Sequence, residues 1–292
     1  MHKESILEQT AKAEHWDLVI KPRNKWYQLD LLSVWHYRDL LFLLVRRDFV
    51  SVYKQTILGP LWLFIQPVLT TMIYVVIFGN IAKISTDGMP PMLFYLAGIT
   101  LWTYFADCLN KTSNTFVANA GVFGKVYFPR LVMPLSVLVS NLVKLGIQML
   151  LFIIMWIYFL IKGAAFQPNY TYILFIPFLI LLMAGLGLGL GILISSLTTK
   201  YRDLTFLVGF GVQLMMYASP IVYPLSAVPA KYKLYLMLNP ITSIIEAFKF
   251  VFLGTGVFSW HALLYSSIVM LGLLLLSLLV FKKVEKTFMD TV

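Results

Sequence analysis

Residues 51–62 read SVYKQTILGPLW, and this stretch decides the fold because a polar, basic run changes within it into apolar sequence. Apolar residues continue to about residue 81, which gives roughly the 20 residues that a helix needs to cross hydrocarbon. Pro60 falls in the predicted first turn, where its missing N–H costs little, and Trp62 suits the headgroup boundary. The stretch therefore predicts the start of a spanning helix. A simple stop-and-anchor junction is the alternative reading.

The segment before this junction mixes basic residues with aromatic and aliphatic ones, among them Trp35, Arg38 and Arg46. We expect an amphipathic helix over residues 31–56 that lies on the membrane surface and leads directly into the first span. Residues 1–30 are polar and lack the pattern of a cleaved signal peptide, so we expect them to form a cytoplasmic N-terminal segment.

Composition places the chain among membrane proteins. Of its 292 residues, 60% are hydrophobic and only 12% are charged, whereas soluble domains have about 25% charged residues. The net charge of +10 does not indicate nucleic-acid binding, because the basic residues lie mostly between apolar runs. The single cysteine, Cys108, excludes an intramolecular disulfide.

Six apolar runs are long enough to cross a bilayer, so we expect an all-α integral membrane protein with six transmembrane helices. They lie at about 59–82, 92–117, 132–161, 172–197, 204–224 and 260–281. Nine Lys and Arg residues precede the first run, whereas the following loop holds only Lys83, so both termini are expected in the cytoplasm. Pro220 should kink the fifth span.

Residues 225–256 predict short re-entrant helices before the last span. Asn239 before Pro240 is a plausible helix start, and Gly254 ends an apolar stretch of about 12 residues, which is too short to cross. Glu246 and Lys249 are at i and i+3, so they could pair on one face of the helix. A pore half-helix and a structural cap over the outer mouth both fit this pattern.

The loop after the second span, near residues 119–129, is short, basic and aromatic. It suits a knob that inserts into a partner, because aromatic and Arg residues carry much of the contact energy at interfaces. An interfacial turn anchored by Tyr127 and Phe128 is the alternative. In the fourth span, two glycine pairs at i and i+4 predict close helix packing, namely Gly185 with Gly189 and Gly187 with Gly191.

Several kinds of chemistry are missing from the sequence. It has no phosphate-binding loop that ends in Gly-Lys-Ser/Thr, so ATP would have to be used by a partner. Its four histidines show no i, i+4 pair, and no metal site is expected. Asp107 is the only carboxylate well inside a predicted span, whereas a proton- or ion-coupled carrier would more often have several; pairing with Lys111 at i+4 is the plain alternative for Asp107.

At this point the chain resembles the permease subunits of type-2 ABC exporters for lipid-linked polysaccharides such as O-antigen, capsule and teichoic acid. The resemblance runs from about Trp26 to the C-terminus. It is carried by YRDLL at 37–41, VYKQT at 52–56, LGPLW at 58–62 and KVYFPR at 125–130, with weaker support from YRD at 201–203, NPIT at 239–242 and EAF at 246–248.

The resemblance implies a homodimeric permease in the bacterial inner membrane that works with two separate ABC ATPase subunits. ATP and Mg²⁺ would bind to those partners, so this chain needs no cofactor and is not an enzyme. An interfacial gate helix would correspond to residues 31–50, a coupling helix to residues 119–129, and re-entrant helices to residues 225–256.

We expect three groups of functional residues and no catalytic ones. The substrate's phosphate headgroup would meet Arg38, Arg46, Arg47 and Lys54; the ATPase would meet Phe123, Lys125, Tyr127 and Phe128; sugars would pass Trp62, Tyr74, Trp102, Tyr104, Tyr217 and Tyr223. The basic residues would equally suit anionic lipid heads.

Two alternatives to polysaccharide export remain at this point. A membrane-embedded transferase acting on lipid-linked sugar would have to draw its acid or base from Asp107, Glu246 and His261. A type-2 ABC permease for a drug or a lipid would share the same topology.

Overall fold

The computed structural model describes residues 31–54, 56–123, 125–164, 166–198 and 203–285. These ranges contain helices and no strand. The elements are α2 (Leu31–His36), α3 (Arg38–Tyr53), η1 (Gly59–Leu61), α4 (Trp62–Tyr74), η2 (Val75–Ile81), α5 (Pro91–Ser113), α6 (Thr115–Ala118), α7 (Ala120–Phe123), α8 (Val132–Ile161), η3 (Tyr170–Phe175), α9 (Ile176–Thr198), α10 (Leu204–Tyr217), η4 (Leu225–Ala227), α11 (Ala230–Met237), α12 (Pro240–Leu253) and α13 (Trp260–Glu285).

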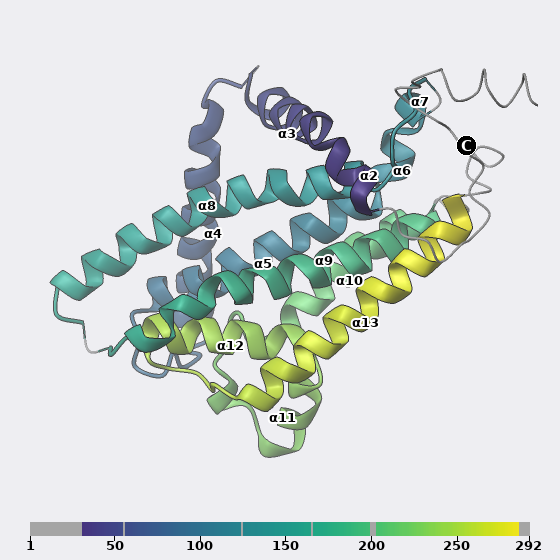
Figure 1. The fold of residues 1–292 in the computed structure, drawn as a ribbon. Helices are drawn as coiled ribbons and strands as arrows, with labels where there is room; N and C mark the ends of the chain where they lie inside the picture. Colours follow the sequence, from purple (N-terminus) through teal and green to yellow (C-terminus); the bar gives the residue numbers. More distant parts are fainter. Residues whose placement is uncertain (1–30, 55, 124, 165, 199–202, 286–292) are drawn as a thin grey trace, which may run out of the picture.

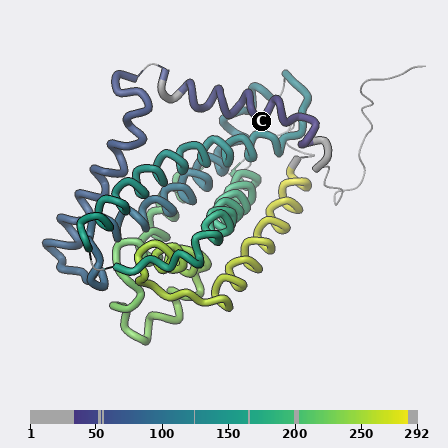
Figure 2. Tube along the Cα trace, turned by 60° about the vertical axis from the view of Figure 1, so that its left-hand side comes forward, coloured from purple at the N-terminus to yellow at the C-terminus, as the bar shows by residue number. Residues whose placement is uncertain are grey.

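The long helices run between two ends of one bundle, as Figures 1 and 2 show. One end carries α2, α3, α6 and α7 and is called the α7 end; the other carries α11 and α12 and is called the α12 end. Five stretches are long and apolar enough to cross a membrane: η1 to η2, α5, α8, η3 to α9, and α13. The chain is therefore a multi-pass membrane protein, as predicted.

α10 is apolar but shorter than the five candidate spans. This helix has only 14 residues, about 21 Å at 1.5 Å per residue. The neighbouring pair α11 and α12 is bent by 101° and gives a sixth candidate span only if the two helices count as one. Two hydrogen bonds hold the ends of this helix pair. Ser226 Oγ, just before α11, donates to Asp87 Oδ1, and Asn169 Nδ2 donates to Phe250 O near the end of α12. Asp87 and Asn169 lie in the loops after η2 and α8, so both ends of the pair are joined to loops at the α12 end; the re-entrant assignment stays a prediction.

The start and end of α12 follow the sequence signals. Asn239 is its N-cap and accepts a hydrogen bond from Ile241 N at 3.1 Å, with Pro240 in the first turn. Gly254 ends the helix with φ +73°, a conformation that suits glycine. Both predictions are confirmed.

The fifth span differs from its prediction because α10 ends at Tyr217 instead of continuing through a kink at Pro220. Proline disfavours a helical conformation for the residue before it and offers no N–H. Ser219 Oγ donates back to Met215 O, and the Pro220 carbonyl accepts from Lys249 Nζ at 2.6 Å. The polar groups that the ending helix frees are thus satisfied locally and by α12.

Glu246 and Lys249 do not pair with each other, so the pairing that their spacing suggested is wrong. Both are buried on α12, with 2% and 1% of their surface exposed. Glu246 Oε2 accepts from Val257 N at 3.2 Å, whereas the Lys249 ammonium binds the Pro220 carbonyl and lies 3.8 Å from the Phe94 ring centroid. The Glu246 carboxylate is therefore bound by the segment after α12 and the Lys249 ammonium by the segment after α10.

The core lies where α5 packs between α8 and α9, and α9 packs in turn on α13. The glycines of α9 explain the close approach. A Cβ on Gly187 or Gly191 would lie 2.9 Å from Cys108 or 2.6 Å from Thr112 of α5. On the other side, a Cβ on Gly185 would meet Met270 of α13 at 2.5 Å, and Gly189 faces the same helix. The predicted small-residue packing is confirmed, with one pair against each neighbour.

Candidate functional site

The helix before the first span is present as α2 and α3, which are separated at Tyr37. α3 lies against α8 at the α7 end (Figure 1). Leu44 is buried on the bundle side, whereas Phe42 and Leu43 keep 62% and 63% of their surface exposed. Apolar side chains therefore emerge on both sides of α3, one set toward the protein and one set away from it, which suits a helix at a membrane surface.

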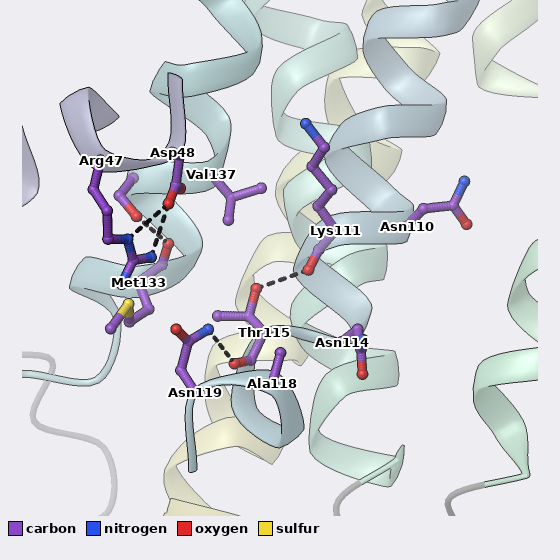
Figure 3. A pocket seen from close by; sticks show the side chains of 11 residues that line it. Arg47, Asp48, Asn110, Lys111, Asn114, Thr115, Ala118, Asn119, Met133 and Val137 are labelled. Carbon is purple, nitrogen blue, oxygen red and sulfur yellow. Dashed lines mark hydrogen bonds and ion pairs between the residues drawn. The ribbon is translucent and has the colours of Figure 1, made fainter. Parts of the chain in front are cut away.

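A polar pocket of about 360 Å³ lies between α3, α5, α6 and α8. In Figure 3, Arg47 and Asp48 lie on one side of it and Lys111, Asn110 and Asn114 on the other. Arg47 binds the Asp48 carboxylate through Nη2 at 2.8 Å and Nε at 3.0 Å. A second pocket of about 220 Å³ adjoins it and shares Asp48 and Lys111.

Polar side chains join α5 to α8 beside these pockets. Lys144 Nζ lies 2.7 Å from Asp107 Oδ2, and Lys111 Nζ donates to Asn141 Oδ1 at 2.9 Å. The alternative that Asp107 pairs with Lys111 is therefore wrong, because each finds a partner on α8. Asn141 Nδ2 also approaches Cys108 Sγ at 3.8 Å.

The four basic residues expected to meet a phosphate headgroup do not converge. Of the four, Arg47 lines the pocket of about 360 Å³. Arg38 lies 3.9 Å from Asp39 and 5.8 Å from the Trp35 ring centroid, and Arg46 and Lys54 are exposed on or just after α3. Their role with the headgroup stays a prediction.

The residues of the loop after α5 divide into a buried and an exposed set. Phe123 and Phe128 are each 6% exposed and stack on one another with ring centroids 5.5 Å apart. Phe116 lies 5.9 Å from Phe123 and 5.1 Å from Phe281 of α13. Together with Leu44 of α3, these rings form what we call the aromatic cluster.

Lys125 and Tyr127 are exposed, Tyr127 with 71% of its surface. The loop therefore offers Lys125 and Tyr127 for a partner. Phe123 and Phe128 pack within the chain instead, so a direct contact of theirs with a partner does not fit their burial.

The six aromatic residues expected along a sugar path fall into three places. Tyr74, Tyr217 and Tyr223 lie at the contact of α4 with α10: Tyr74 Oη is 3.4 Å from Met216 Sδ, and Tyr223 Oη donates to Tyr217 O at 2.9 Å. Trp102 and Tyr104 are buried within the core, with 6% and 2% of their surface exposed, so they could only form part of the wall behind a sugar path. Trp62 lies apart, half-exposed at the start of α4.

The sequence of this chain matches the model of a known protein family. Residues 39–253 match the family model described as ABC-2 type transporter, and this segment runs from α3 to the end of α12. The chain belongs to the ABC-2 type transporter family.

Curated relatives cover most of the permease. It is 30% identical over 253 residues to the O-antigen export system permease protein RfbA of Klebsiella pneumoniae, an alignment that covers 86% of this chain and 94% of that protein. It is 28% identical to RfbA of Myxococcus xanthus, over 75% of this chain and 82% of that protein. The polysialic acid transport protein KpsM of Escherichia coli is 24% identical over 71% of this chain and 78% of its own length.

Sequence reasoning missed Lys144 of the permease. This lysine lies inside the third predicted span, and an ionisable residue within a span calls for a named partner. That rule alone would have pointed to Lys144, and Asp107 would then have been its natural partner.

The three candidate acids or bases for a transferase are not assembled into one site. Asp107 lies toward the α7 end of α5 and is paired with Lys144. Glu246 and His261 belong to α12 and the first turn of α13, at the α12 end. Within the described ranges, no group of three or more His, Cys, Asp and Glu side chains could hold a metal ion.

Proposed function

We propose that the permease is the transmembrane subunit of an ATP-driven exporter that moves a lipid-linked polysaccharide, of the O-antigen or capsule kind, outward across the bacterial cytoplasmic membrane. The observation that carries this proposal is the match with an O-antigen export permease over 94% of that protein's length. Two copies of this chain would assemble with two copies of a separate ABC ATPase, and ATP and Mg²⁺ would bind there rather than here.

The α7 end faces the cytoplasm in this proposal. Basic residues support that orientation, since nine Lys and Arg residues precede the first span, and Lys282 and Lys283 end α13 at the same side. Lys83, after the first span, is alone in its loop.

The ATPase would dock on the exposed part of the loop after α5. Val126 and Tyr127 are 56% and 71% exposed, and Lys125 lies beside them. Exposed aromatic residues supply much of the binding energy of protein interfaces. Directly behind this surface, Phe123 and Phe128 belong to the aromatic cluster, which also contains Leu44 of α3 and Phe281 of α13. A movement of the loop would therefore be transmitted through this cluster to α3 and α13.

The substrate would approach along α3. Arg38, Arg46, Arg47 and Lys54 would attract its phosphate groups, because guanidinium binds phosphate through two parallel hydrogen bonds. Its sugars would then slide over the rings of Tyr74, Tyr217 and Tyr223 at the contact of α4 and α10, with Trp62 at the start of α4 and with Trp102 and Tyr104 in the wall behind. Aromatic faces bind sugars by stacking without fixing one position.

The test is to express the permease with a candidate ATPase, purify the complex through a tag on the permease, and compare wild type with Tyr127→Ala. Tyr158→Ala is the matched control, because Tyr158 is an exposed aromatic at the other end of the bundle. We expect an ATPase to co-purify with wild type and Tyr158→Ala and to be lost with Tyr127→Ala. If no ATPase follows wild type in several mild detergents, the exporter proposal fails.

The substrate is tested in proteoliposomes made with the complex. Lipid-linked polysaccharide should raise ATP hydrolysis and leave the vesicle face on which the ATPase lies. Stimulation by a drug or by ordinary lipid alone would favour another cargo. A purified permease that modified lipid-linked sugar without an ATPase, and lost that activity with Asp107→Asn, would instead indicate a transferase.

A further inference from the structure

The pockets beneath α3 carry more positive charge than their carboxylates neutralise. Three cations, Arg47, Lys111 and Lys144, face two carboxylates, Asp48 and Asp107, which leaves one net positive charge. Arg47 is paired with Asp48 and Lys144 with Asp107. Among the described residues, Lys111 Nζ has a neutral amide, Asn141, as its hydrogen-bond partner and no carboxylate within 4.0 Å. Lys111 is therefore the cation that an anion would satisfy.

A second observation points to a missing ligand at the same place. Ser140 lines the smaller pocket together with Lys111 and Lys144, and its buried hydroxyl has no hydrogen-bond partner within the part of the chain that the structure describes. A buried hydroxyl without a partner costs free energy. Ser140 and Lys144 are four residues apart on α8, so they lie on one face of this helix. A phosphate group bound in this pocket would accept from Ser140 Oγ and Lys111 Nζ, with Lys144 already paired with Asp107.

The pocket also borders an apolar surface suited to a lipid chain. Leu142 and Val143 follow directly after the polar residues of α8 and are 37% and 42% exposed. From Val143, exposed aliphatic side chains continue along α8 through Leu150 and Ile154 to Ile161. Val143 and Ile161 are 18 residues apart along the helix, which corresponds to about 27 Å. A headgroup in the pocket would therefore have its chain beside a continuous apolar stripe.

From these contacts we propose that the cleft between α3, α5 and α8 binds the phosphate headgroup of a membrane lipid, with Lys111 and Ser140 as its first contacts. This rests on the proposed function in one respect, namely that the lipid is the phosphorylated carrier of the exported glycan. Arg47, which holds the Asp48 carboxylate in Figure 3, neutralises the acidic group of the pocket lining that would repel the phosphate. The site lies on the spans behind the four cations expected along α3.

The test uses purified full-length permease without ATPase and three probes: a C55 polyprenyl phosphate, phosphatidylglycerol and inorganic phosphate. Binding is measured by native mass spectrometry from detergent and by titration in nanodiscs of phosphatidylcholine. Lys111→Gln should weaken binding of the polyprenyl phosphate about tenfold, and Ser140→Ala by a smaller factor. Lys111→Arg should retain most of the affinity because it keeps the charge.

Lys162→Gln is the matched control, since Lys162 follows the other end of α8 and lies 5.0 Å over the Tyr158 ring. It should bind the polyprenyl phosphate as wild type does. Unchanged binding by Lys111→Gln would overturn the proposal, as would equal binding of inorganic phosphate and of both lipids. Tighter binding of the polyprenyl phosphate than of phosphatidylglycerol would identify the carrier as the ligand, and equal binding of the two lipids would identify any lipid phosphate.

Failure of this site and failure of the export function are distinguishable. If the complex exports glycan while Lys111→Gln binds lipid normally, only the site is wrong. If lipid binding depends on Lys111 but no ATPase associates with the permease, the site stands and the export function fails.

Discussion

Lys249 Nζ donates a hydrogen bond to the carbonyl oxygen of Pro220 at 2.6 Å, and this contact joins helix α12 to the segment that follows α10. Lys249 is 1% exposed, so water cannot replace the bond. We expect Lys249→Met, which keeps the length of the side chain, to destabilise the protein by about 1–3 kcal/mol, because the Pro220 carbonyl loses its partner.

The measurement is the thermal unfolding midpoint in detergent, together with the labelling rate of a cysteine placed at exposed Ala227, which leaves the Ser226–Asp87 contact intact. The midpoint should fall and labelling should quicken, since the segment after α10 is released. Lys231→Met, an exposed lysine on α11, serves as the control. An unchanged midpoint for Lys249→Met would show that the contact contributes nothing to stability.

Glycine substitutions should change stability with opposite signs at two positions. A Cβ on Gly191 would lie 2.6 Å from Thr112 Cβ, so Gly191→Ala forces α9 and α5 apart and should cost about 1–3 kcal/mol. Nothing lies within 4 Å of a Cβ on Gly146 of α8. Gly146→Ala should therefore be neutral or stabilise by about 0.5–1 kcal/mol, as alanine does in a helix. Unfolding midpoints of the two variants check this, and a fall of equal size in both would contradict it.

Phe128 and Tyr127 are adjacent but should fail in different ways. Phe128→Ala removes a ring from the aromatic cluster and should lower stability by about 3 kcal/mol, because a cavity remains. Tyr127→Ala, at an exposed position, should change the free energy of unfolding by no more than about 0.5 kcal/mol and affect only partner binding. Calorimetry of the permease alone separates the two. A large loss of stability in Tyr127→Ala would mean that this ring is structural.

Asn239 has two roles that substitution can separate. Its Oδ1 caps α12, and its Nδ2 donates to Ala218 O and to Ser219 Oγ at 3.1 and 2.9 Å. Asn239→Asp keeps the cap and loses the donors, whereas Asn239→Ala loses both. We expect Asn239→Ala to cost about 1 kcal/mol more than Asn239→Asp in denaturant or thermal unfolding. Equal losses would mean that the cap itself is without effect.

Much of the fold was predictable because its signals are local. Pro60 in a first turn, Asn239 before Pro240, and Gly254 after an apolar run each specify a helix end through backbone chemistry within a few residues. The glycines of α9 predicted close packing for the same reason, since a missing side chain has the same effect whichever helix approaches it. The sequence could not say that one pair faces α5 and the other α13.

The polar contacts were less predictable because they depend on which helices become neighbours. Lys111 is four residues from Asp107, yet Asp107 pairs with Lys144, which is 37 residues away on α8. Glu246 and Lys249 could pair by their spacing, but each is bound by a different segment. In both cases a tertiary contact replaces the pairing that helical spacing predicts. The candidate site beneath α3 could therefore be located only in part, through Arg47.

The aromatic cluster also has a consequence for biosynthesis. Leu44 lies in α3, near the N-terminal end of the described residues, and Phe281 in α13, near their C-terminal end, yet both contribute to this cluster. At about 5–20 residues per second, synthesis of the intervening chain takes on the order of 10–50 s. Until α13 is made, α3 lacks part of the surface against which it packs. During synthesis, α3, which lines both pockets, can therefore complete its packing only after α13 has been made.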